Sequence, residues 1–341
     1  MLSDTSESQT SSGLTLDRCT QHQAFDIFYT WSIQEHWNPG SKGEDILDVF
    51  YKIDPQGFFY GKILNKETLR EEIVSIVSGV RYGEDQAWVG FYIVSPNHRG
   101  HGYGIASFHK ALEHVGHNRL SVGLDGVMAQ VENYKKSGFT SIAWQNERRN
   151  GSARELVEVQ ERELADQILK GTVPGLVHLS DAQVDLEQLP LIEQKYSGLK
   201  RPQFVKDWAL FHTHHPEQHR FGVAVLGEEG QKNGKPVVLG YACVRPAESS
   251  YRVGPLYAST PEVAKQLLVK LAFEVVQAEK QKPYNIPLQF DVDIPNSNKE
   301  AAKLFDGLGW NDTFPSMRMW KGKVPEHDVN GVYAVSTLEV G

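Results

Sequence analysis

The sequence has only two cysteines, Cys19 and Cys243, in 341 residues. They lie far apart in the chain, and neither belongs to a metal-binding or redox motif. Small secreted proteins that depend on disulfides carry many more cysteines, so a disulfide framework is excluded. A reducing compartment is the simpler expectation, and we therefore expect a cytoplasmic protein.

Long apolar runs and basic clusters are also missing. No stretch of about eighteen apolar residues occurs, so we expect no membrane-spanning helix. The net charge is −8 and the pI is near 5.9, which argues against nonspecific binding to nucleic acid or to an anionic membrane. A small substrate, for example a cationic one, fits this balance better. Residues 1–13 lack the basic start and apolar stretch of a secretion signal and are expected to form a disordered tail.

The length and the hydrophobic content of the chain suffice for two domains. The chain is longer than a typical single domain and is 40% hydrophobic, enough for a sizeable core. Strand-like and helix-like stretches alternate, as in a mixed α/β fold. We predict a first domain over residues 14–150, a linker over 151–175 and a second domain over 176–341.

The periodicity and turn signals place the elements of both halves. The strands expected in the first half are Leu14–Arg18, Gly57–Lys62, Ile73–Arg81, Ala87–Val94, Leu120–Leu124 and Thr140–Asn146, and the helices are Ala24–His36, Asp45–Tyr51, Gly104–Val115 and Met128–Lys136. The second half repeats this order. The repetition is clearest where Tyr134–Phe139 and Phe305–Trp310 each end a helix with glycine before an aromatic residue.

One loop carries most of the chemical information. Residues 87–94 are strand-like, Pro96 ends the strand, and Gly100, Gly102 and Gly104 precede the next helix. Glycines let the backbone approach a ligand, and the free N–H groups of a helix N-terminus favour an anion such as pyrophosphate. Arg99 can add a phosphate contact. A dinucleotide site is the weaker alternative, because no acidic residue ends the next strand in the required βαβ context; Asp125 is the nearest candidate.

The spacing Arg-x-x-Gly-x-Gly, with Tyr134 and Gly138 downstream, resembles the acyl-CoA signature of the GNAT acyltransferase superfamily. Trp37–Gly40, Asp54–Phe59 and Gly254–Ala258 are similar to segments of a two-copy subgroup. The resemblance implies two tandem GNAT-like domains with a mixed sheet, and acetyl-CoA or another acyl-CoA as co-substrate without a metal. It also implies that the strand before the loop splays from its neighbour and pairs with the pantetheine arm.

The resemblance assigns roles residue by residue. The cofactor-binding residues would be Tyr92, Ile93, Val94, Arg99, Gly100, His101, Gly102, Tyr103 and Gly104. Tyr134 would protonate the departing thiolate, which has a basicity close to that of a phenol; simple packing at a helix end is its alternative. Many relatives have an asparagine about seven residues before this tyrosine, whereas this chain has Val127.

The second copy is expected to lack catalysis. Residues 251–261 have no Arg-x-x-Gly-x-Gly pattern, Thr260 and Pro261 form an ordinary helix start, and Phe305 replaces the tyrosine. This copy would stiffen the first one or form a wall of the acceptor pocket. Candidates for that wall are Tyr257, Asp291, Asp293 and Arg318, each of which has a purely structural alternative.

The sequence offers several candidates for the residues that bind the acceptor and for the general base. Glu35, Trp37 and Asp45 lie in the segment expected on the acceptor side, and Glu35, His36 or Asp45 could take the proton of the acceptor ammonium. The alternative that we favour for Glu35, His36 and Asp45 is a solvated helix residue, and the base is not assigned. The histidines His212, His214, His215 and His219 lack the ligand spacing of a metal site, so we expect none.

These features predict transfer of an acetyl or short acyl group from acyl-CoA to a primary amine of a small molecule, in a ternary complex. A noncatalytic acyl-CoA-binding module and a protein-lysine acetyltransferase are the alternatives. The sequence predicts neither the acyl length nor the oligomeric state.

Overall fold

The computed structural model describes residues 13–116, 118–213, 216–232 and 234–341, so the expected tail at residues 1–13 lies, apart from Gly13, outside the described residues. The described strands are β1 (Thr15–Arg18), β2 (Phe58–Asn65), β3 (Arg70–Tyr82), β4 (Gln86–Val94), β5 (Ser121–Val127), β6 (Ser141–Ser152), β7 (Leu176–His178), β8 (Phe221–Lys232), β9 (Lys235–Pro246), β10 (Tyr251–Ala258), β11 (Gln289–Pro295), β12 (Asn311–Gly322) and β13 (Val332–Ala334). The α-helices are α1 (Gln21–Gln34), α2 (Tyr51–Ile53), α3 (Tyr103–Val115), α4 (Val131–Lys136), α5 (Ala153–Glu155), α6 (Arg162–Lys170), α7 (Leu189–Ser197), α8 (Pro202–Thr213), α9 (Pro261–Gln281) and α10 (Lys299–Gly307).

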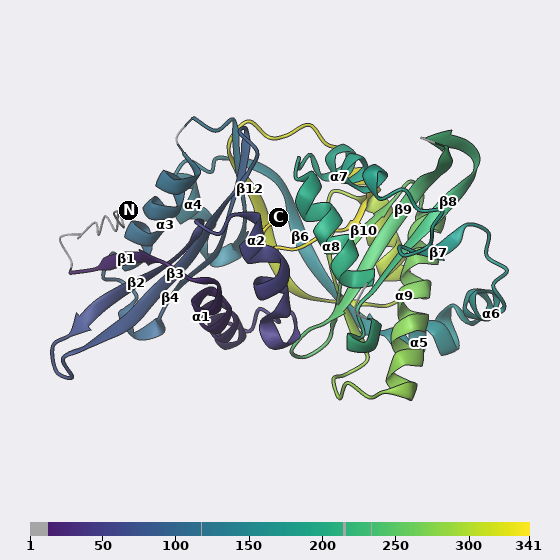
Figure 1. Ribbon diagram of the computed structural model, residues 1–341, viewed down its shortest axis with the longest axis horizontal. Helices are drawn as coiled ribbons and strands as arrows, with labels where there is room; N and C mark the ends of the chain where they lie inside the picture. Colours follow the sequence, from purple (N-terminus) through teal and green to yellow (C-terminus); the bar gives the residue numbers. More distant parts are fainter. Residues whose placement is uncertain (1–12, 117, 214–215, 233) are drawn as a thin grey trace.

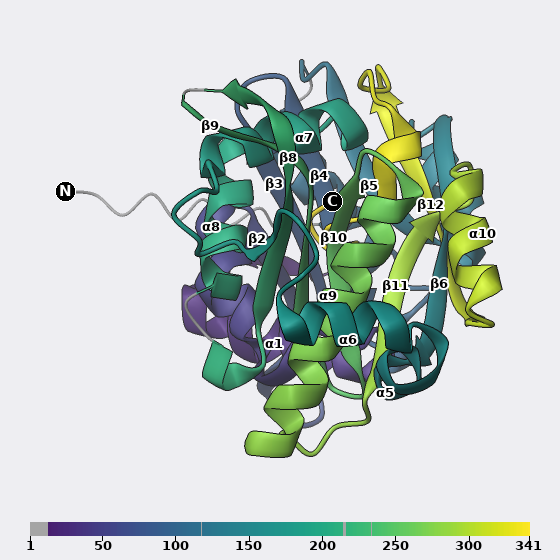
Figure 2. The ribbon, with the colours of Figure 1, turned by 90° about the vertical axis from the view of Figure 1, so that its right-hand side faces the viewer.

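One mixed sheet runs through both halves of the molecule (Figure 1). Its strand order is β1-β2-β3-β4-β5-β12-β6-β11-β10-β9-β8-β7, and β13 adds to β10. This confirms the expected α/β fold with a mixed sheet and two repeated units. Helix α9 runs along the strands of the second half (Figure 2). None of the described helices has the length and apolar character needed to cross a membrane.

Local sequence signals explain where the helices begin. Thr20 accepts a hydrogen bond from the Gln23 backbone N–H, and the Gln23 side chain accepts one from the Thr20 N–H, which forms a capping box for α1. Thr260 caps α9, with Pro261 in the first turn, as the sequence predicts. The helix expected at Asp45–Tyr51 is present, with a π-helical turn at Ile46–Phe50 that continues into α2.

The two glycine turns that suggested a repeat have the same hydrogen bonds. Gly138 and Gly309 have φ angles of 95° and 68°, values that favour glycine. The Phe139 N–H donates to the Tyr134 carbonyl at 3.0 Å, and the Trp310 N–H donates to the Phe305 carbonyl at 3.1 Å. Both are helix C-terminal motifs, so the two halves are built on one plan at this point.

The strands after these turns are exchanged between the halves. β6, from the first half, lies between β12 and β11, and β12, from the second half, lies between β5 and β6. The end of the first domain, expected at residue 150, therefore falls inside β6. The segment expected to be a linker contains α5 and α6, and its Ala153 and Leu156 are buried in the core that includes α9. The polypeptide thus crosses between the halves within the sheet.

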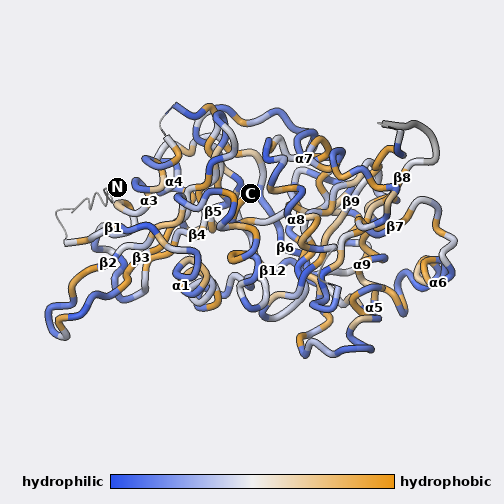
Figure 3. The backbone as a smooth tube through the Cα atoms, viewed as in Figure 1, coloured by the Kyte–Doolittle hydropathy of each residue, from blue (hydrophilic) through white to orange (hydrophobic). Residues whose placement is uncertain are grey.

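A second contact between the halves is an aromatic core. The rings of Phe50 and Trp208 stack with centroids 5.5 Å apart, and Phe28 and Phe91 belong to the same cluster. Burial of aromatic side chains stabilises such an interface strongly. Hydrophobic residues follow the central strands, whereas the tip of the β2–β3 hairpin is hydrophilic (Figure 3). The free thiols of Cys19 and Cys243 are both buried.

Candidate active site

Strands β4 and β5 diverge and leave a slot between them. They pair in parallel only from Gln86 to Trp88, opposite Ser121 to Gly123. Beyond this point β4 contains a β-bulge. The register of its pairing with β3 shifts between Ile76 and Ser78. Phe91 has a positive φ of 47° at the bulge, a conformation that only a well-packed site tolerates in a bulky residue. The splaying of this strand, implied by the resemblance, is present.

The glycine loop joins the slot to helix α3. Gly100 and Gly102 have φ angles of 84° and 83°, and Gly102 is the N-cap of the helix. A Cβ on Gly104 would lie 2.4 Å from the Tyr92 hydroxyl oxygen, so any other residue would have to displace the Tyr92 side chain or move the helix away from β4.

Free backbone amides gather at this loop. Among the described residues, the N–H groups from Gly100 to Ile105 donate to no backbone carbonyl, and the first such bond of the helix runs from Ala106 to Gly102 at 3.2 Å. These donors and the positive end of the helix dipole favour an anion with several oxygen atoms. The loop therefore fits a pyrophosphate group.

Arg99 contacts both sides of the cavity mouth. Its Nε donates to the Val94 carbonyl at 3.0 Å, and a terminal nitrogen lies 2.5 Å from the Glu35 carboxylate, at the end of α1. The Arg99 side chain is about half exposed, at 53%. Because a guanidinium has five N–H donors, Arg99 can also donate to a phosphate while it keeps this ion pair.

Tyr134 lies on α4 at the inner end of the slot. Its ring packs against Tyr92 and Phe108, with centroid distances of 6.4 and 5.8 Å. A Cβ on Gly126 would lie 2.5 Å from the ring, so this glycine of β5 makes room for it. Burial, followed by the nearby Tyr92 phenol, raises the pKa of Tyr134 above its ordinary value. The phenol therefore keeps its proton at neutral pH and can act as an acid.

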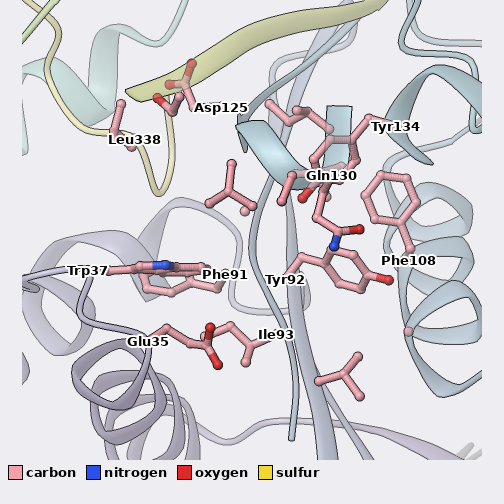
Figure 4. A pocket seen from close by; sticks show the side chains of 18 of the residues that line it. Glu35, Trp37, Phe91, Tyr92, Ile93, Phe108, Asp125, Gln130, Tyr134 and Leu338 are labelled. Atoms are coloured by element: carbon pink, nitrogen blue, oxygen red, sulfur yellow. The ribbon is translucent and has the colours of Figure 1, made fainter. Parts of the chain in front are cut away.

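These elements enclose a cavity of about 550 Å³. Figure 4 shows Tyr92, Gln130 and Tyr134 near Phe108 on one side, and Trp37, Phe91 and Leu338 on the other. The residues that line the cavity come from both halves: Glu35, Trp37, Val89, Gly90, Phe91, Tyr92, Ile93, Val94, His98, Arg99, Gly100, Gly102, Gly104, Ile105, Phe108, Leu124, Asp125, Val127, Ala129, Gln130, Tyr134, Arg148, Phe314, Ser316, Leu338 and Glu339.

The floor of the cavity contains a buried ion pair between the halves. Arg318, on β12, donates to both oxygens of Asp125, on β5, at 2.9 and 2.5 Å. Asn146 donates to the same carboxylate at 2.9 Å. The guanidinium lies between the rings of Trp88 and Trp144, 4.8 and 5.0 Å from their centroids. Burial raises the pKa of Asp125, and Arg318 opposes that shift.

A second ionic network extends from the floor into the second half. Arg148 donates to both oxygens of Asp293 at 2.8 and 2.9 Å, and Arg252 bridges Asp293 and Glu339 at 3.2 and 2.5 Å. Burial opposes ionisation of Glu339, but Arg252 and Arg245 lower its pKa below the ordinary value. The carbonyl oxygen of Glu339 lies against Gly90, where a Cβ would be 1.9 Å away.

Most, but not all, of the residues expected to bind the cofactor line the cavity. Tyr92, Ile93, Val94, Arg99, Gly100, Gly102 and Gly104 do. The side chains of His101 and Tyr103 do not; their rings stack with centroids 5.8 Å apart, so these residues can contribute only backbone amides. Val127, at the position of the family asparagine, also lines the cavity.

The acceptor candidates separate into two groups. Glu35 and Trp37 line the cavity. Four others, contrary to expectation, do not line it, because each is held by buried hydrogen bonds or ion pairs to other residues. Asp45 forms ion pairs with Arg220 and Arg245 at 2.8 and 2.6 Å, and Asp293 forms ion pairs with Arg148 and Arg252. The Tyr257 hydroxyl contacts Glu193 and Ser336. Asp291 accepts hydrogen bonds from Asn38 and Ser250. His36 is exposed and is likewise absent from the lining.

The histidines of the second half are dispersed. His212 is buried against Trp208 and contacts its carbonyl at 2.7 Å, whereas His219 contacts the Tyr251 hydroxyl at 2.7 Å. Burial, followed by the charge of Arg220, lowers the pKa of His212 to about 3. His214 and His215 lie outside the described residues. In the described part of the chain, no three potential ligands meet as a metal site would require.

The corresponding slot of the second half is filled by the chain itself. β10 pairs in parallel with β11 only from Tyr251 to Val253, just as β4 does with β5. Beyond this point β13 pairs with β10, at Leu256 and Tyr257. Asn298 fixes the filling segment by donating to the carbonyls of Asn330 and Val332. This occupied slot, together with the missing glycine loop, explains why the second copy is degenerate.

The sequence did not indicate the cavity residues of the second half. Phe314, Ser316, Leu338 and Glu339 come from β12 and from the segment after β13, and no local motif marks them. Strand exchange brings Phe314 and Ser316 into the first site, and the segment after β13 brings Leu338 and Glu339 there. The helical spacing of Phe108 on α3, which places it on the face towards β4, could have identified that residue.

Two family models match the chain. One, described as Acetyltransferase (GNAT) family, matches residues 21–139, and one described as Acetyltransferase (GNAT) domain matches residues 192–334. Holothin acyltransferase of Pseudoalteromonas sp. (strain SANK 73390) is 27% identical over 319 residues, which are 94% of this chain and 92% of that protein.

Solved structures share the fold. A protein from Pyrococcus horikoshii, described only provisionally as an acetyltransferase, matches with a TM-score of 0.70 and 19% identity over 98% of both chains. A tandem GNAT protein from the clavulanic acid biosynthesis pathway matches with a TM-score of 0.54 and 13% identity, over 90% of this chain and 97% of the other.

The fold, the glycine loop and these matches define the class: the chain belongs to the GNAT acyltransferase family. Within that class it has two GNAT domains in tandem. Its first copy carries the glycine loop, and its second copy has filled the equivalent slot.

Proposed function

We propose that the first copy transfers an acetyl or other short acyl group from acyl-CoA to the primary amine of a small molecule. The observation that carries this proposal is the continuous path from the free amides at Gly100–Ile105, along the open edge of β4, to Tyr134. A pyrophosphate fits the amides, an extended pantetheine arm fits the strand edge, and the thioester would then lie near the phenol.

The chemistry follows from this arrangement. The acceptor nitrogen attacks the thioester carbonyl in a ternary complex, the C–N bond forms, and the C–S bond breaks. Tyr134 gives its proton to the leaving thiolate and regains one from the acylated nitrogen through the cavity. Burial keeps the phenol protonated at neutral pH, as this role requires.

A small acceptor is supported by the walls opposite Tyr134. Trp37 and Leu338 come from two separate segments and limit the space on that side, and Phe314 of β12 lines the cavity as well. The relative named holothin acyltransferase also supports acyl transfer to a small molecule, and holothin belongs among the acceptors to be tested. A protein lysine would need an open groove.

The test is thiol release from acetyl-CoA, followed with a chromogenic thiol reagent. A panel would include holothin, aryl amines, polyamines, aminosugars, amino acids and a lysine peptide. We expect release that depends on a small amine and an N-acylated product identified by mass spectrometry. Binding of acetyl-CoA without release by any acceptor would instead indicate a noncatalytic module, and release with the lysine peptide alone would indicate a protein acetyltransferase.

A further inference from the structure

We propose that the acceptor is an aromatic amine that is uncharged at neutral pH, and not an alkylammonium ion. This deepens the acyl transfer proposed above and depends on it. The inference combines two features of the acceptor side of the cavity: its charged groups are already paired with one another, and its free surface is aromatic and aliphatic.

Every carboxylate that lines the cavity, within the described residues, already has a guanidinium partner. Glu35 lies 2.5 Å from Arg99, Asp125 is held by two bonds from Arg318, and Glu339 lies 2.5 Å from Arg252. An ammonium ion entering the cavity would therefore find no carboxylate awaiting a cation. Loss of its hydration shell would then be only partly compensated.

The two carboxylates of the floor are also poorly suited to act as bases. Asp125 accepts three hydrogen bonds, from Arg318 and Asn146. Glu339 uses one oxygen for Arg252 and the other for the Leu338 backbone N–H at 3.1 Å. Hydrogen-bond donors thus occupy both oxygens of each carboxylate, so neither is placed to deprotonate an ammonium ion.

The cations of the lining are paired as well. Arg148 is bound to Asp293 by two hydrogen bonds, and Arg99 is bound to Glu35. His98 belongs to the loop before the glycine turn, where its Nε2 lies 3.7 Å from Glu72. The cavity thus presents balanced charges, which suit an uncharged acceptor.

The remaining surface on the acceptor side is apolar and rich in rings. Trp37, Phe91 and Leu338 lie across the cavity from Tyr92 and Tyr134 (Figure 4). Phe314 lines the cavity as well, with the Arg148 guanidinium 5.2 Å from its ring centroid. Aromatic rings pack well against other flat rings, so this wall fits an aryl or heteroaryl amine.

An uncharged amine makes the reaction possible without a base before attack. Its nitrogen lone pair forms the C–N bond directly, and the C–S bond breaks. The nitrogen becomes strongly acidic as the bond forms, and its proton replaces the one that Tyr134 gives to sulfur. No group has to remove a proton from the free acceptor.

The test compares aryl amines with benzylic amines of the same ring substitution, using acetyl-CoA and the full chain. At pH 7 the aryl amines are neutral and the benzylic amines are cations. We expect kcat/KM to be more than about tenfold higher for the aryl member of each pair. For the aryl amines, kcat/KM should be nearly constant between pH 6 and 9.

Variants of the wall give an independent readout. Phe314→Ala and Leu338→Ala should raise the KM for the aryl amine and leave the affinity for acetyl-CoA nearly unchanged. The exposed Leu191→Ala is the matched control, because this side chain lies on α7 and is 47% exposed. A preference for benzylic amines, or an aryl-amine rate that rises steeply with pH, overturns this inference but leaves acyl transfer intact. Absence of thiol release with all amines overturns acyl transfer as well.

Discussion

Arg318 and Asp125 form a doubly hydrogen-bonded ion pair that links the exchanged strand β12 of the second half to β5 of the first. Both side chains are almost completely buried, with exposures of 1% and 0%. The floor of the acyltransferase site and the junction of the two halves are therefore the same structure. Changes that loosen this pair should affect both stability and the site.

Removing one partner of this pair should destabilise the protein strongly. Arg318→Met leaves the Asp125 carboxylate buried without its cation, a loss of about 3–5 kcal/mol. The double variant Asp125→Leu with Arg318→Met should lose less, because no charge is left unpaired. Urea unfolding measures both. The control is Lys303→Met, which removes an exposed pair with Glu300 and should cost under about 1 kcal/mol. An Arg318→Met variant as stable as this control would contradict the account.

Gly104→Ala should disturb the cofactor site. Its Cβ would lie 2.4 Å from the Tyr92 hydroxyl, so either Tyr92 or the start of α3 must move, and the loop amides would lose their alignment. We expect acetyl-CoA affinity to fall about tenfold or more, by calorimetry. Gly307→Ala, at the end of α10, has no atom within 4 Å of the new Cβ and should leave affinity unchanged. Equal affinities of the two variants would exclude this role of Gly104.

Tyr134→Phe should separate turnover from binding. The ring packing against Phe108 and Tyr92 remains, whereas the proton donor is lost, so kcat should fall about 10- to 100-fold with a similar acetyl-CoA affinity. Tyr284→Phe removes a hydroxyl that contacts Ser41 at 3.4 Å and serves as the control. If Tyr134→Phe retains the full kcat, the departing thiolate takes its proton from another source.

Stability should fall as the pH drops below about 6.5, partly because of His212. Burial and the nearby Arg220 lower the pKa of this side chain from 6.5 to about 3. Between these values the unfolded chain binds a proton that the folded chain does not, which favours unfolding by about 1.4 kcal/mol per pH unit. His212→Gln should therefore show a shallower decline between pH 6 and 4.5, followed by urea unfolding. The exposed His109→Gln should keep the original slope; identical slopes in the two variants would refute this assignment.

The sequence predicted those parts of the molecule that depend on local signals. The Arg99–Gly104 loop, the Thr260 cap and the glycine turns at Gly138 and Gly309 each occupy a few consecutive residues, and each is present as expected. These elements also sufficed to identify the family and the tandem plan.

The acceptor side could not be predicted because it depends on long-range pairing. Phe314 reaches the cavity because β12 lies between β5 and β6. Leu338 lines the cavity because the chain returns to it after β13. Likewise, Asp45 could not be recognised as an ion-pair partner, because Arg220 and Arg245 are distant in sequence. No local sequence pattern indicates contacts between residues that are so far apart in the chain.

The most direct test of the central claim is a calorimetric titration of the whole protein with acetyl-CoA. With one open slot and one filled slot, we predict one molecule bound per chain. Arg99→Ala should weaken this binding about 10- to 100-fold, whereas Arg154→Ala, an exposed arginine on α5, should leave it unchanged. Two molecules bound per chain, or one whose affinity is unaffected by Arg99→Ala, would contradict the account.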